Sequence, residues 1–334
     1  MKAKGKRQKA KVLPQRGRGS SLIPHPSSFK NARVLVVGDA MLDRYWYGEV
    51  DRISPEAPVP IVKIDAEKVD ERPGGAANVA CNAAELGAHV TLLSVVGADE
   101  PGVRLESLLQ RRRVHVQLHH DRSIRTIVKL RVVARNQQLL RVDFESKPSH
   151  EVLASKLRNF AKMLERVDVV ILSDYGKGGL THIARMIAMA RGAGKTVLVD
   201  PKGEDYARYR GATIITPNRS EFRQVAGSWN GEREMADLAQ RLRRKLEARA
   251  LLITRGDEGM TLFQDEGRFH VPAQAREVFD VSGAGDTVIA TLAVALAGGM
   301  RMRDAVRLAN RAGGIVVGKL GTAVVTPEEL FGQG

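Results

Sequence analysis

The chain has 334 residues, and its 53 Lys and Arg against 38 Asp and Glu give it a net charge of +15. A balance this basic makes a nucleic-acid-binding or membrane-surface protein the first class to test. The longest unbroken apolar stretch, near Val288–Ala297, is about half of the ~18 residues that a membrane-spanning helix needs, which excludes a transmembrane protein. The single cysteine, Cys81, excludes a disulfide scaffold and is typical of a reducing cytoplasm.

The basic charge is concentrated at the N-terminus. Residues 1–32 hold nine Lys and Arg and no acid, and subtracting those nine from +15 leaves +6 on the rest of the chain. The segment is rich in Gly, Ser, Pro and Gln and has no periodic apolar pattern, so it buries too little surface to offset its ordering entropy. We expect residues 1–30 to be a disordered basic tail ahead of one globular domain, 31–334, and favour a solvated extension over a nucleic-acid arm.

From Arg33 onward, predicted strands alternate with predicted helices. The apolar run Arg33–Gly38 is typical of a strand covered on both faces. Further strands are predicted over His89–Val96, Asp168–Ser173, Thr196–Asp200, Thr213–Thr216 and Leu251–Thr254, and helices over Gly75–Leu86, from the cap Ser149 to Glu165, Thr181–Arg191 and Glu232–Ala248. This order predicts an α/β fold with a central, mostly parallel sheet and helices on both faces.

Two stretches interrupt the alternation. Tyr45–Ile64 contains several prolines and no helix signal, and Arg125–Phe144 is rich in β-formers on either side of a polar turn. Each follows an early strand-helix unit. We therefore expect a small antiparallel β lid, built from about residues 44–66 and 118–145, that projects from the main domain.

Two phosphate-loop patterns are absent. Gly194-Lys195-Thr196 resembles the end of a P-loop, but Met189 stands where a glycine is required and a strand follows instead of a helix. The first strand is followed by Gly38–Asp43, which has acids where a dinucleotide fingerprint needs glycine. A P-loop enzyme and a dinucleotide-dependent oxidoreductase are both disfavoured.

The strongest motif is Asp280–Thr287, which leads directly into an apolar helix. Its small residues Gly283, Ala284 and Gly285 let backbone N–H groups at the helix start converge on one anion, with help from the helix dipole. Asp286 lies in the first turn, where a carboxylate can accept the proton of an attacking hydroxyl. The alternative is a plain glycine-rich turn with a dipole-matching acid.

A second motif, Thr216–Glu221, follows a strand and opens a helix. Asn218 and Glu221 share a helix face and could hold Mg²⁺ through water. The same spacing satisfies a capping box with Asn218 as the N-cap, and the two interpretations are compatible.

Two glycine-rich segments complete the set of motifs. Gly256 and Gly259, after Thr254, suit either the close approach of a nucleotide or a hairpin turn. The segment Pro73–Asn78 opens the early helix. In it, Gly74 and Gly75 expose bare backbone to a small substrate, and Asn78 could bind a hydroxyl.

These motifs occur in the order and spacing of the ribokinase-like, or PfkB, carbohydrate kinases, which the chain resembles over about residues 31–330. The resemblance implies a ribokinase-like fold, ATP and Mg²⁺, a cytoplasmic location and a homodimer formed through the lid. It implies that Asp286 is the base, that Asp43, Gly74, Gly75 and Asn78 hold the sugar, and that Asn218, Thr254, Gly256, Gly259 and Asn310 surround the nucleotide, with Mg²⁺ near Glu221. Ala312–Ala323 is similar to a region that binds K⁺ in some relatives. One departure is Ser282, where the family usually has threonine.

Four further segments resemble the branch of this family that phosphorylates D-glycero-β-D-manno-heptose 7-phosphate at its anomeric hydroxyl, for ADP-heptose and lipopolysaccharide inner-core synthesis. They are Gly38–Gly48, Arg52–Pro60, Ala134–Gln138 and Ser173–Gly178. We expect the kinase-only form, since no nucleotidyl-transfer motif follows. The cations expected at the substrate phosphate are Lys177, Lys129, Arg131 and Arg141, each with solvent-facing charge as the alternative.

Two other functions remain open from the sequence. One is a kinase of another sugar or sugar phosphate, such as ribose or fructose 6-phosphate. The other is a nucleic-acid-binding protein that acts through the basic tail. Only 4% of the residues are aromatic and none is interleaved with the Lys run, so base stacking has little support and no nucleic-acid partner is expected.

Overall fold

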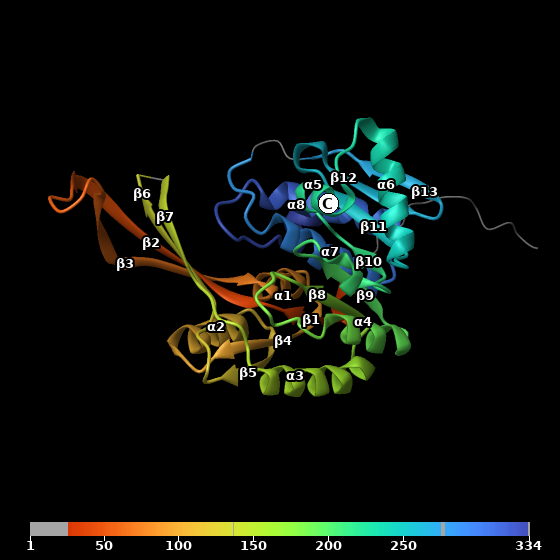
Figure 1. Cartoon of the computed structure of the whole chain (residues 1–334), viewed down its shortest axis with the longest axis horizontal. Coiled ribbons are helices and arrows are strands. Elements are labelled where there is room, and N and C mark those ends of the chain that lie inside the picture. The colour runs from red at the N-terminus through yellow and green to blue at the C-terminus, as the bar shows by residue number, and fades with distance from the viewer. Residues whose placement is uncertain (1–25, 136, 275–277, 333–334) are drawn as a thin grey trace, which may run out of the picture.

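The computed structural model describes residues 26–135, 137–274 and 278–332, and it confirms the expected α/β fold (Figure 1). The main sheet of the described residues has the strand order β13-β12-β11-β10-β9-β8-β1-β4-β5. Its strands are β1 (Arg33–Gly38), β4 (His89–Gly97), β5 (His115–Asp121), β8 (Val169–Ser173), β9 (Thr196–Asp200), β10 (Ile214–Ile215), β11 (Ala250–Thr254), β12 (Met260–Gln264) and β13 (Gly267–Val271). From β5 to β11 all pairs are parallel, and β12 and β13 add an antiparallel edge.

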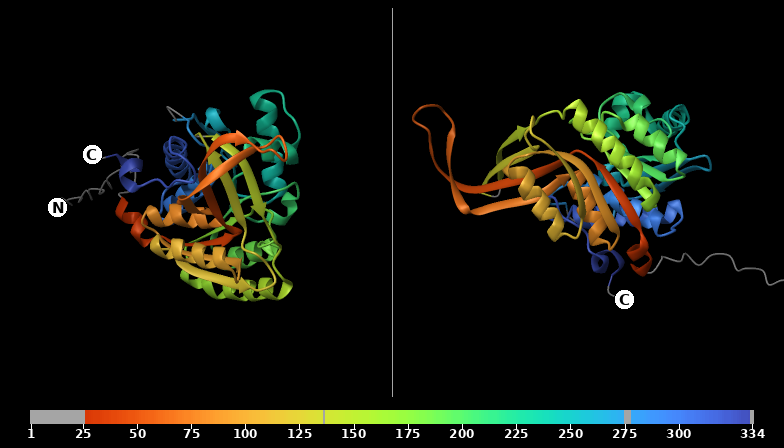
Figure 2. Two further views of the ribbon diagram at one scale, coloured as in Figure 1. Left: turned by 90° about the vertical axis from the view of Figure 1, so that its left-hand side faces the viewer. Right: turned by 90° about the horizontal axis from the view of Figure 1, so that it is seen from below.

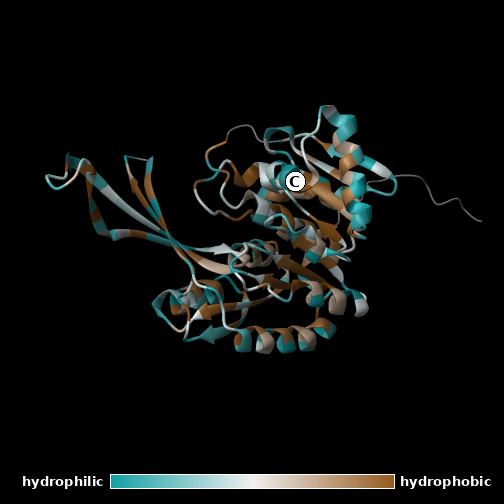
Figure 3. Ribbon diagram, viewed as in Figure 1, coloured by the Kyte–Doolittle hydropathy of each residue, from teal (hydrophilic) through white to brown (hydrophobic). Residues whose placement is uncertain are grey.

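Helices cover both faces of this sheet. One face packs against α1 (Ala76–Glu85), α2 (Glu100–Arg111), α7 (Ala284–Ala297) and α8 (Met302–Val316), and the other against α3 (His150–Met163), α4 (Ile183–Gly192), α5 (Arg219–Ala226) and α6 (Gly231–Lys245). A last short helix, α9 (Pro327–Phe331), packs on α8. Figure 3 shows apolar residues along the central strands and α7, and polar residues on the outer turns of α3 and α6.

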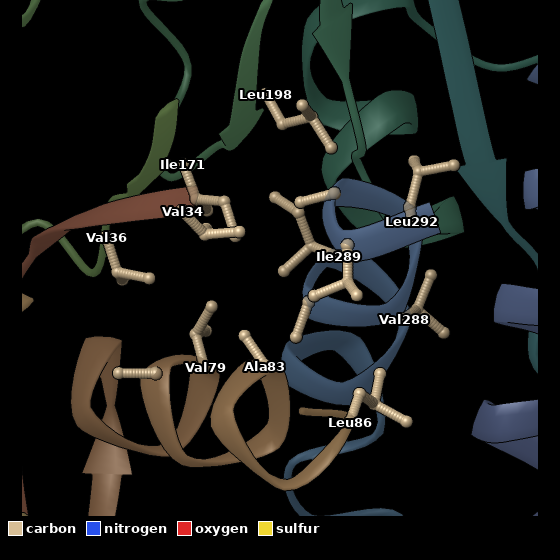
Figure 4. Close-up of a cluster of buried hydrophobic side chains, with 14 of the residues drawn as sticks. Val34, Val36, Val79, Ala83, Leu86, Ile171, Leu198, Val288, Ile289 and Leu292 are labelled. Carbon is tan, nitrogen blue, oxygen red and sulfur yellow. The ribbon is translucent and has the colours of Figure 1, made fainter. Parts of the chain in front are cut away.

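The alternation of side chains along β1 explains why it is apolar throughout. Val34 and Val36 face the layer of α1 and α7, while Leu35 and Val37 face the opposite layer, and all four are fully buried. Figure 4 shows the first of these layers, where Ile289 of α7 lies between the sheet and α1. The buried helix α7 is therefore held in place on two sides, and its N-terminus is fixed at the carboxyl edge of the sheet.

The lid is a second sheet with the order β3-β2-β6-β7, and it projects away from the main body (Figures 1 and 2). Its strands are β2 (Ala40–Ile53), β3 (Pro60–Gly75), β6 (Val128–Ala134) and β7 (Gln137–Phe144). Because β2 and β6 run parallel, the sheet is mixed, and the expectation of an antiparallel lid was wrong.

The lid boundaries also differ from the prediction. The segment 118–145 begins too early, since β5 continues in the main sheet to Asp121. The segment 44–66 is too short, because β2 starts one residue after β1 and β3 runs back to Gly75 at the start of α1. Only Asp39 separates β1 of the main sheet from β2 of the lid sheet, so no turn sequence marks the border between the two sheets.

The N-terminal boundary needs a further correction. Pro26–Asn31 form a 3₁₀ helix, so the expected tail 1–30 extends too far. Phe29 is fully buried, its ring centroid 5.7 Å from that of Phe331, and this one aromatic side chain anchors the segment. Residues 1–25 lie outside the described residues. In the part of the chain that the structure describes, no helix has the length and apolarity to cross a membrane.

Candidate active site

The candidate site lies at the carboxyl edge of the main sheet, where α7 begins. Gly283 is the N-cap of α7 and has a left-handed backbone, with φ 78°. A Cβ at this position would lie 2.7 Å from the side-chain nitrogen of Asn78, so only glycine fits. This turn places Asp286 in the first turn of the helix, as the sequence predicted.

Asp286 is buried and accepts two hydrogen bonds from distant parts of the chain. The Tyr175 hydroxyl donates to Oδ1 at 2.6 Å, and Asn78 Nδ2 donates to Oδ2 at 2.8 Å. Burial raises the pKa of Asp286 to about 6, although these two hydrogen bonds act to lower it. The side chain is therefore ionised at neutral pH while its pKa is close to that pH, which suits a general base.

Asn78 has a contact that the sequence interpretation did not include. We expected it to bind a sugar hydroxyl, but its amide nitrogen points to Asp286. Its Oδ1 in turn accepts a hydrogen bond from Asn82 Nδ2 at 3.2 Å, and Asn82 Oδ1 accepts one from Thr287 Oγ1 at 2.9 Å. These buried bonds fix the orientation of the Asn78 amide from α1.

Tyr175 was missed as a functional residue. It lies in the loop after β8, and its side chain reaches across the site to Asp286. A usable signal existed in the sequence, because Tyr175 lies two residues after a buried strand and precedes Gly176 and Gly178. Polar residues at that position of a parallel sheet face the ligand edge.

The backbone cradle at the start of α7 is smaller than predicted. The N–H of Ala284 donates to the carbonyl of Val281 at 3.2 Å, so it is used within the turn. Gly285 lines the cavity beside Asp286, and its first-turn N–H belongs to the set that a helix leaves without an internal acceptor. Of the three predicted residues, Ala284 therefore has its N–H engaged within the turn, whereas Gly283 and Gly285 line the cavity.

A cavity of about 230 Å³ adjoins the base and is rich in acids. Asp200, at the end of β9, lines it together with Glu221 and Asp286. Burial, followed by the negative charges of Asp286 and Glu221, raises the pKa of Asp200 well above its ordinary value. Sequence reasoning missed Asp200, although a strand-terminal acid at this edge was a signal. The accumulated negative charge fits a divalent cation.

The capping-box interpretation of Asn218 and Glu221 is confirmed. Asn218 Oδ1 accepts from the N–H of Glu221 at 2.9 Å, and Glu221 Oε2 accepts from the N–H of Asn218 at 3.0 Å. The other oxygen of Glu221 accepts from Lys202 Nζ at 3.1 Å. With both oxygens engaged, Glu221 suits contact with a metal through water better than direct coordination.

A second, more apolar cavity of about 670 Å³ continues from the first. The predicted nucleotide residues Asn218, Thr254, Gly256, Gly259 and Asn310 all line it. The two cavities share Asn218, Thr254, Gly285 and Val288, so the second cavity adjoins the one that Asp286 lines. Asn310 also holds the cavity wall, because its Nδ2 donates to the carbonyl of Pro272 at 2.8 Å.

The predicted sugar residues lie where the lid meets the main body. Asp43 is buried on β2 and pairs with Arg131 of β6 at 2.7 Å. A Cβ at Gly74 would lie 2.5 Å from Asp43 Oδ2, so bare backbone is required there. Gly75 is the N-cap of α1, which carries Asn78.

The four predicted phosphate-binding cations differ in their partners. Lys177 pairs with Glu145 at 2.5 Å, and Arg141 pairs with Asp143 at 2.9 Å in an exposed position. Arg131 is held by Asp43. Lys129 has no ion pair among the described residues and lies over the ring of Tyr175, 5.5 Å from its centroid. Burial lowers its pKa, so Lys129 is the cation with most to gain from an anionic ligand.

Asp286 is a buried carboxylate at a helix N-terminus. It lies beside the small acidic cavity and the larger apolar one, an arrangement typical of enzymes that transfer phosphoryl groups to small molecules. The chain belongs to the pfkB family of carbohydrate kinases, whose model matches residues 31–329. Almost the whole described structure is therefore a single carbohydrate-kinase fold.

Among curated proteins, the chain is similar to the D-beta-D-heptose 7-phosphate kinase of Bordetella bronchiseptica. The two are 58% identical over 302 residues, which cover 90% of this chain and 96% of that protein. The bifunctional protein HldE of Nitrosococcus oceani is 53% identical over 312 residues, 92% of this chain. The chain spans 64% of the length of that bifunctional relative.

Solved structures support the fold at much lower identity. Phosphofructokinase-2 from Escherichia coli, in complex with potassium, has a TM-score of 0.74 at 20% identity, covering 90% of this chain and 97% of that chain. Ribokinase from Arabidopsis thaliana, complexed with ribose and ATP, has a TM-score of 0.72 at 20% identity, covering 90% and 98%. The predicted ribokinase-like fold is confirmed.

Proposed function

We propose that this carbohydrate kinase transfers the γ-phosphoryl group of ATP to the anomeric hydroxyl of D-glycero-β-D-manno-heptose 7-phosphate and forms the 1,7-bisphosphate. The observation that carries the proposal is Asp286, buried at the start of α7 with a pKa raised to about 6. The heptose substrate is supported by the 58% identical relative that is named for it. The product serves ADP-heptose and lipopolysaccharide synthesis.

In the proposed reaction, Asp286 takes the proton from the attacking hydroxyl. The first-turn N–H groups at Gly285 and Asp286 stabilise negative charge on the oxygens of the phosphoryl group while that group is transferred. Asp43 and the backbone at Gly74 and Gly75 hold the sugar hydroxyls. Positioning and electrostatic stabilisation supply the catalysis, because phosphoryl transfer requires little covalent chemistry from the protein.

The acidic cavity is where Mg²⁺ fits. Asp200 and Glu221 give it negative charge that Lys202 only partly offsets. When bound, the ion neutralises charge on the phosphate oxygens of the nucleotide. Asn218, Thr254, Gly256, Gly259 and Asn310 hold the nucleotide itself in the adjoining cavity.

A potassium ion at the junction of two loops is a further part of the proposal. Asp280 accepts hydrogen bonds from the N–H groups of Ser282 and Gly321, which brings the two loops together. The Thr322 hydroxyl is buried there without a hydrogen-bond partner among the described residues. An oxygen left in this condition fits a bound cation.

Two statements about the protein in the cell belong to the same proposal. We propose a cytoplasmic enzyme, because its nucleotide donor and its phosphorylated sugar are intracellular metabolites. We also propose a homodimer formed through the lid, supported by exposed apolar side chains on β7 and β3, among them Leu139, Leu140, Phe144 and Val69.

The decisive experiment combines one variant with product identification. Asp286→Asn should lower kcat by at least ~10², the scale for loss of one key group, with little change in KM for ATP. NMR of the wild-type product should show phosphate on the anomeric carbon of the heptose 7-phosphate. A variant with near-wild-type turnover would remove Asp286 as the base. Equal kcat/KM for ribose or fructose 6-phosphate would favour the alternative sugar substrates.

A further inference from the structure

The loop that carries Tyr175 is pinned by one buried carboxylate. Asp39 lies directly after β1 and is 4% exposed. Its Oδ2 accepts from the N–H groups of Tyr175 at 3.1 Å and Lys177 at 3.0 Å, and its Oδ1 accepts from that of Gly179 at 2.9 Å. Three backbone hydrogen bonds to one side chain fix the course of the loop 175–179.

The same residue holds the start of α1 through its main chain. The carbonyl of Asp39 accepts from the N–H of Ala76 at 3.1 Å, the first residue of the helix that carries Asn78. Tyr175 and Asn78 are the two hydrogen-bond donors to Asp286. Asp39 therefore contacts both segments that supply those donors, although it does not contact the base.

A buried lysine contacts the same loop as Asp39. Lys156 of α3 is fully buried, and its Nζ donates to the carbonyl of Gly179 at 2.8 Å. Its positive charge stabilises the ionised form of Asp39 in surroundings where burial raises the pKa of that carboxyl. Burying charged groups this deeply costs free energy. Here both groups hold the loop that carries Tyr175, which donates a hydrogen bond to the candidate base.

We propose that Asp39 is a positioning residue for catalysis, which locates the Tyr175 hydroxyl so that Asp286 is held, ionised and correctly oriented, against the attacking hydroxyl of the sugar. The proposal rests on the proposed function, in which Asp286 is the base. It assigns the geometry of the loop 175–179 to the reaction rather than to substrate binding.

Several groups around Asp286 bear on its protonation and are part of the test. Tyr175 after β8 and Asn78 on α1 donate to it. Asp43 on β2 and Asp200 at the end of β9 add negative charge, and Lys129 on β6 adds positive charge. None of these charged groups changes in the variants below, so a shift in the pH profile reports the loss of the hydrogen bond.

The first experiment removes a single hydroxyl. In Tyr175→Phe the acid limb of the kcat/KM profile should move to higher pH by about half a unit or more, because a bond that stabilises the carboxylate is lost. At pH 6, kcat should fall about twofold or more, because a half-unit rise halves the ionised fraction of Asp286 there, while KM for ATP stays within about twofold. Tyr206→Phe is the matched control, since the Tyr206 hydroxyl is buried with no hydrogen-bond partner among the described residues.

The second experiment tests Asp39 through Tyr175. Asp39→Asn keeps one acceptor oxygen but turns an NH₂ group toward a backbone N–H, so the loop loosens. Its acid limb should move in the same direction as that of Tyr175→Phe, and the double variant should shift no further than the larger single shift. Asp39→Ser, which keeps an acceptor oxygen, replaces Asp39→Asn if the latter does not fold.

Each outcome decides the proposal. Unchanged acid limbs in both single variants, or additive shifts in the double variant, overturn it. If Asp286→Asn is inactive while Tyr175→Phe keeps the wild-type profile, the base assignment stands and only the positioning role fails. If Asp286→Asn remains active, the proposed function fails independently of Asp39.

Discussion

At the scale of single residues, the site is defined by which charged groups already have partners. Of the four cations that the sequence offered for the substrate phosphate, Lys177, Arg131 and Arg141 each form an ion pair with a carboxylate. Lys129 lies half-buried over Tyr175 without one, among the described residues. A cation that has been partly desolvated and has no counter-ion binds an anion more strongly than a paired, exposed one.

Lys129→Met should therefore raise KM for the sugar phosphate by about tenfold or more, the effect of losing one charge-assisted hydrogen bond. Binding of ATP should change by less than about twofold. Arg141→Met is the matched control, because its side chain is exposed and paired with Asp143 on its own strand. Steady-state kinetics with each substrate varied separately gives the answer. An unchanged KM in Lys129→Met, or an equal rise in Arg141→Met, would contradict a particular role of Lys129 in binding the phosphate.

The raised pKa of Asp286 also predicts how the free energy of unfolding of the protein changes with pH. Burial raises its pKa from 3.8 to about 6, so the folded state holds this proton more tightly than the unfolded state does. The stability from this group is fully present below about pH 4 and is lost as the pH rises through 6. The wild type loses this stabilisation between pH 4 and pH 7.5, and Asp286→Asn does not. The free energy of unfolding of the variant minus that of the wild type should therefore rise by roughly 2 kcal/mol over this range. Urea unfolding at both pH values measures this difference, and an unchanged difference would contradict the raised pKa.

At the scale of elements, the helix α7, which holds the candidate base, has a glycine with a left-handed backbone at or near each end. It starts at Gly283, whose left-handed backbone and close approach to Asn78 exclude any side chain. It ends near Gly299, which is also left-handed but has open space around its α-carbon. The two glycines share a positive φ that would strain any other residue, and they differ in what surrounds them.

Gly283→Ala and Gly299→Ala form a matched pair for this reason. Each should destabilise the protein by about 1–2 kcal/mol, the cost of a left-handed non-glycine residue. Only Gly283→Ala should also lower kcat, by at least ~10², because the new Cβ displaces Asn78 and moves the first turn with Asp286. Thermal unfolding and kcat, measured on the same preparations, separate the two effects. A comparable loss of kcat in both variants would assign it to general destabilisation.

At the scale of the whole molecule, the lid is the part that leaves several apolar side chains exposed to solvent. It stands away from the main body as a four-stranded sheet (Figure 2), and its strands expose Leu139, Leu140 and Phe144 by 41–56%. Apolar side chains gathered on one projecting sheet favour burial against another surface. The helix α2 of the main body also exposes an apolar side chain, Val103, but as an isolated one.

Leu140→Glu should therefore convert the proposed dimer into monomers, because a charge buried in an apolar interface is left unpaired. Val103→Glu, at an equally exposed position on α2, should leave the oligomeric state unchanged. Sedimentation velocity over a range of protein concentrations measures both. A dimer that survives Leu140→Glu would place the interface away from β7.

The order of elements and the position of the candidate base were predictable because they depend on local rules. Apolar runs of strand length, Ser149 as a helix cap and the small residues before Asp286 act over a few neighbouring residues. The lid boundaries were less predictable, since β2 and β3 pass from the main body into the lid without a turn. Phe29 was absorbed into an expected tail because one aromatic residue in a polar segment has no periodicity to mark it.

The sequence by itself thus determined the fold class, the family and the place of the candidate base Asp286 in the first turn of a helix, since each follows from motifs that are continuous along the chain. Only the tertiary structure decided what surrounds that aspartate. Tyr175 and Asn78 meet Asp286 from 111 and 208 residues away, and Asp39 holds both of their segments. The physical reason is that hydrogen bonding and ion pairing depend on distance in space. In the folded chain, Lys177, Arg131 and Arg141 have carboxylate partners, while Lys129 has no ion pair among the described residues.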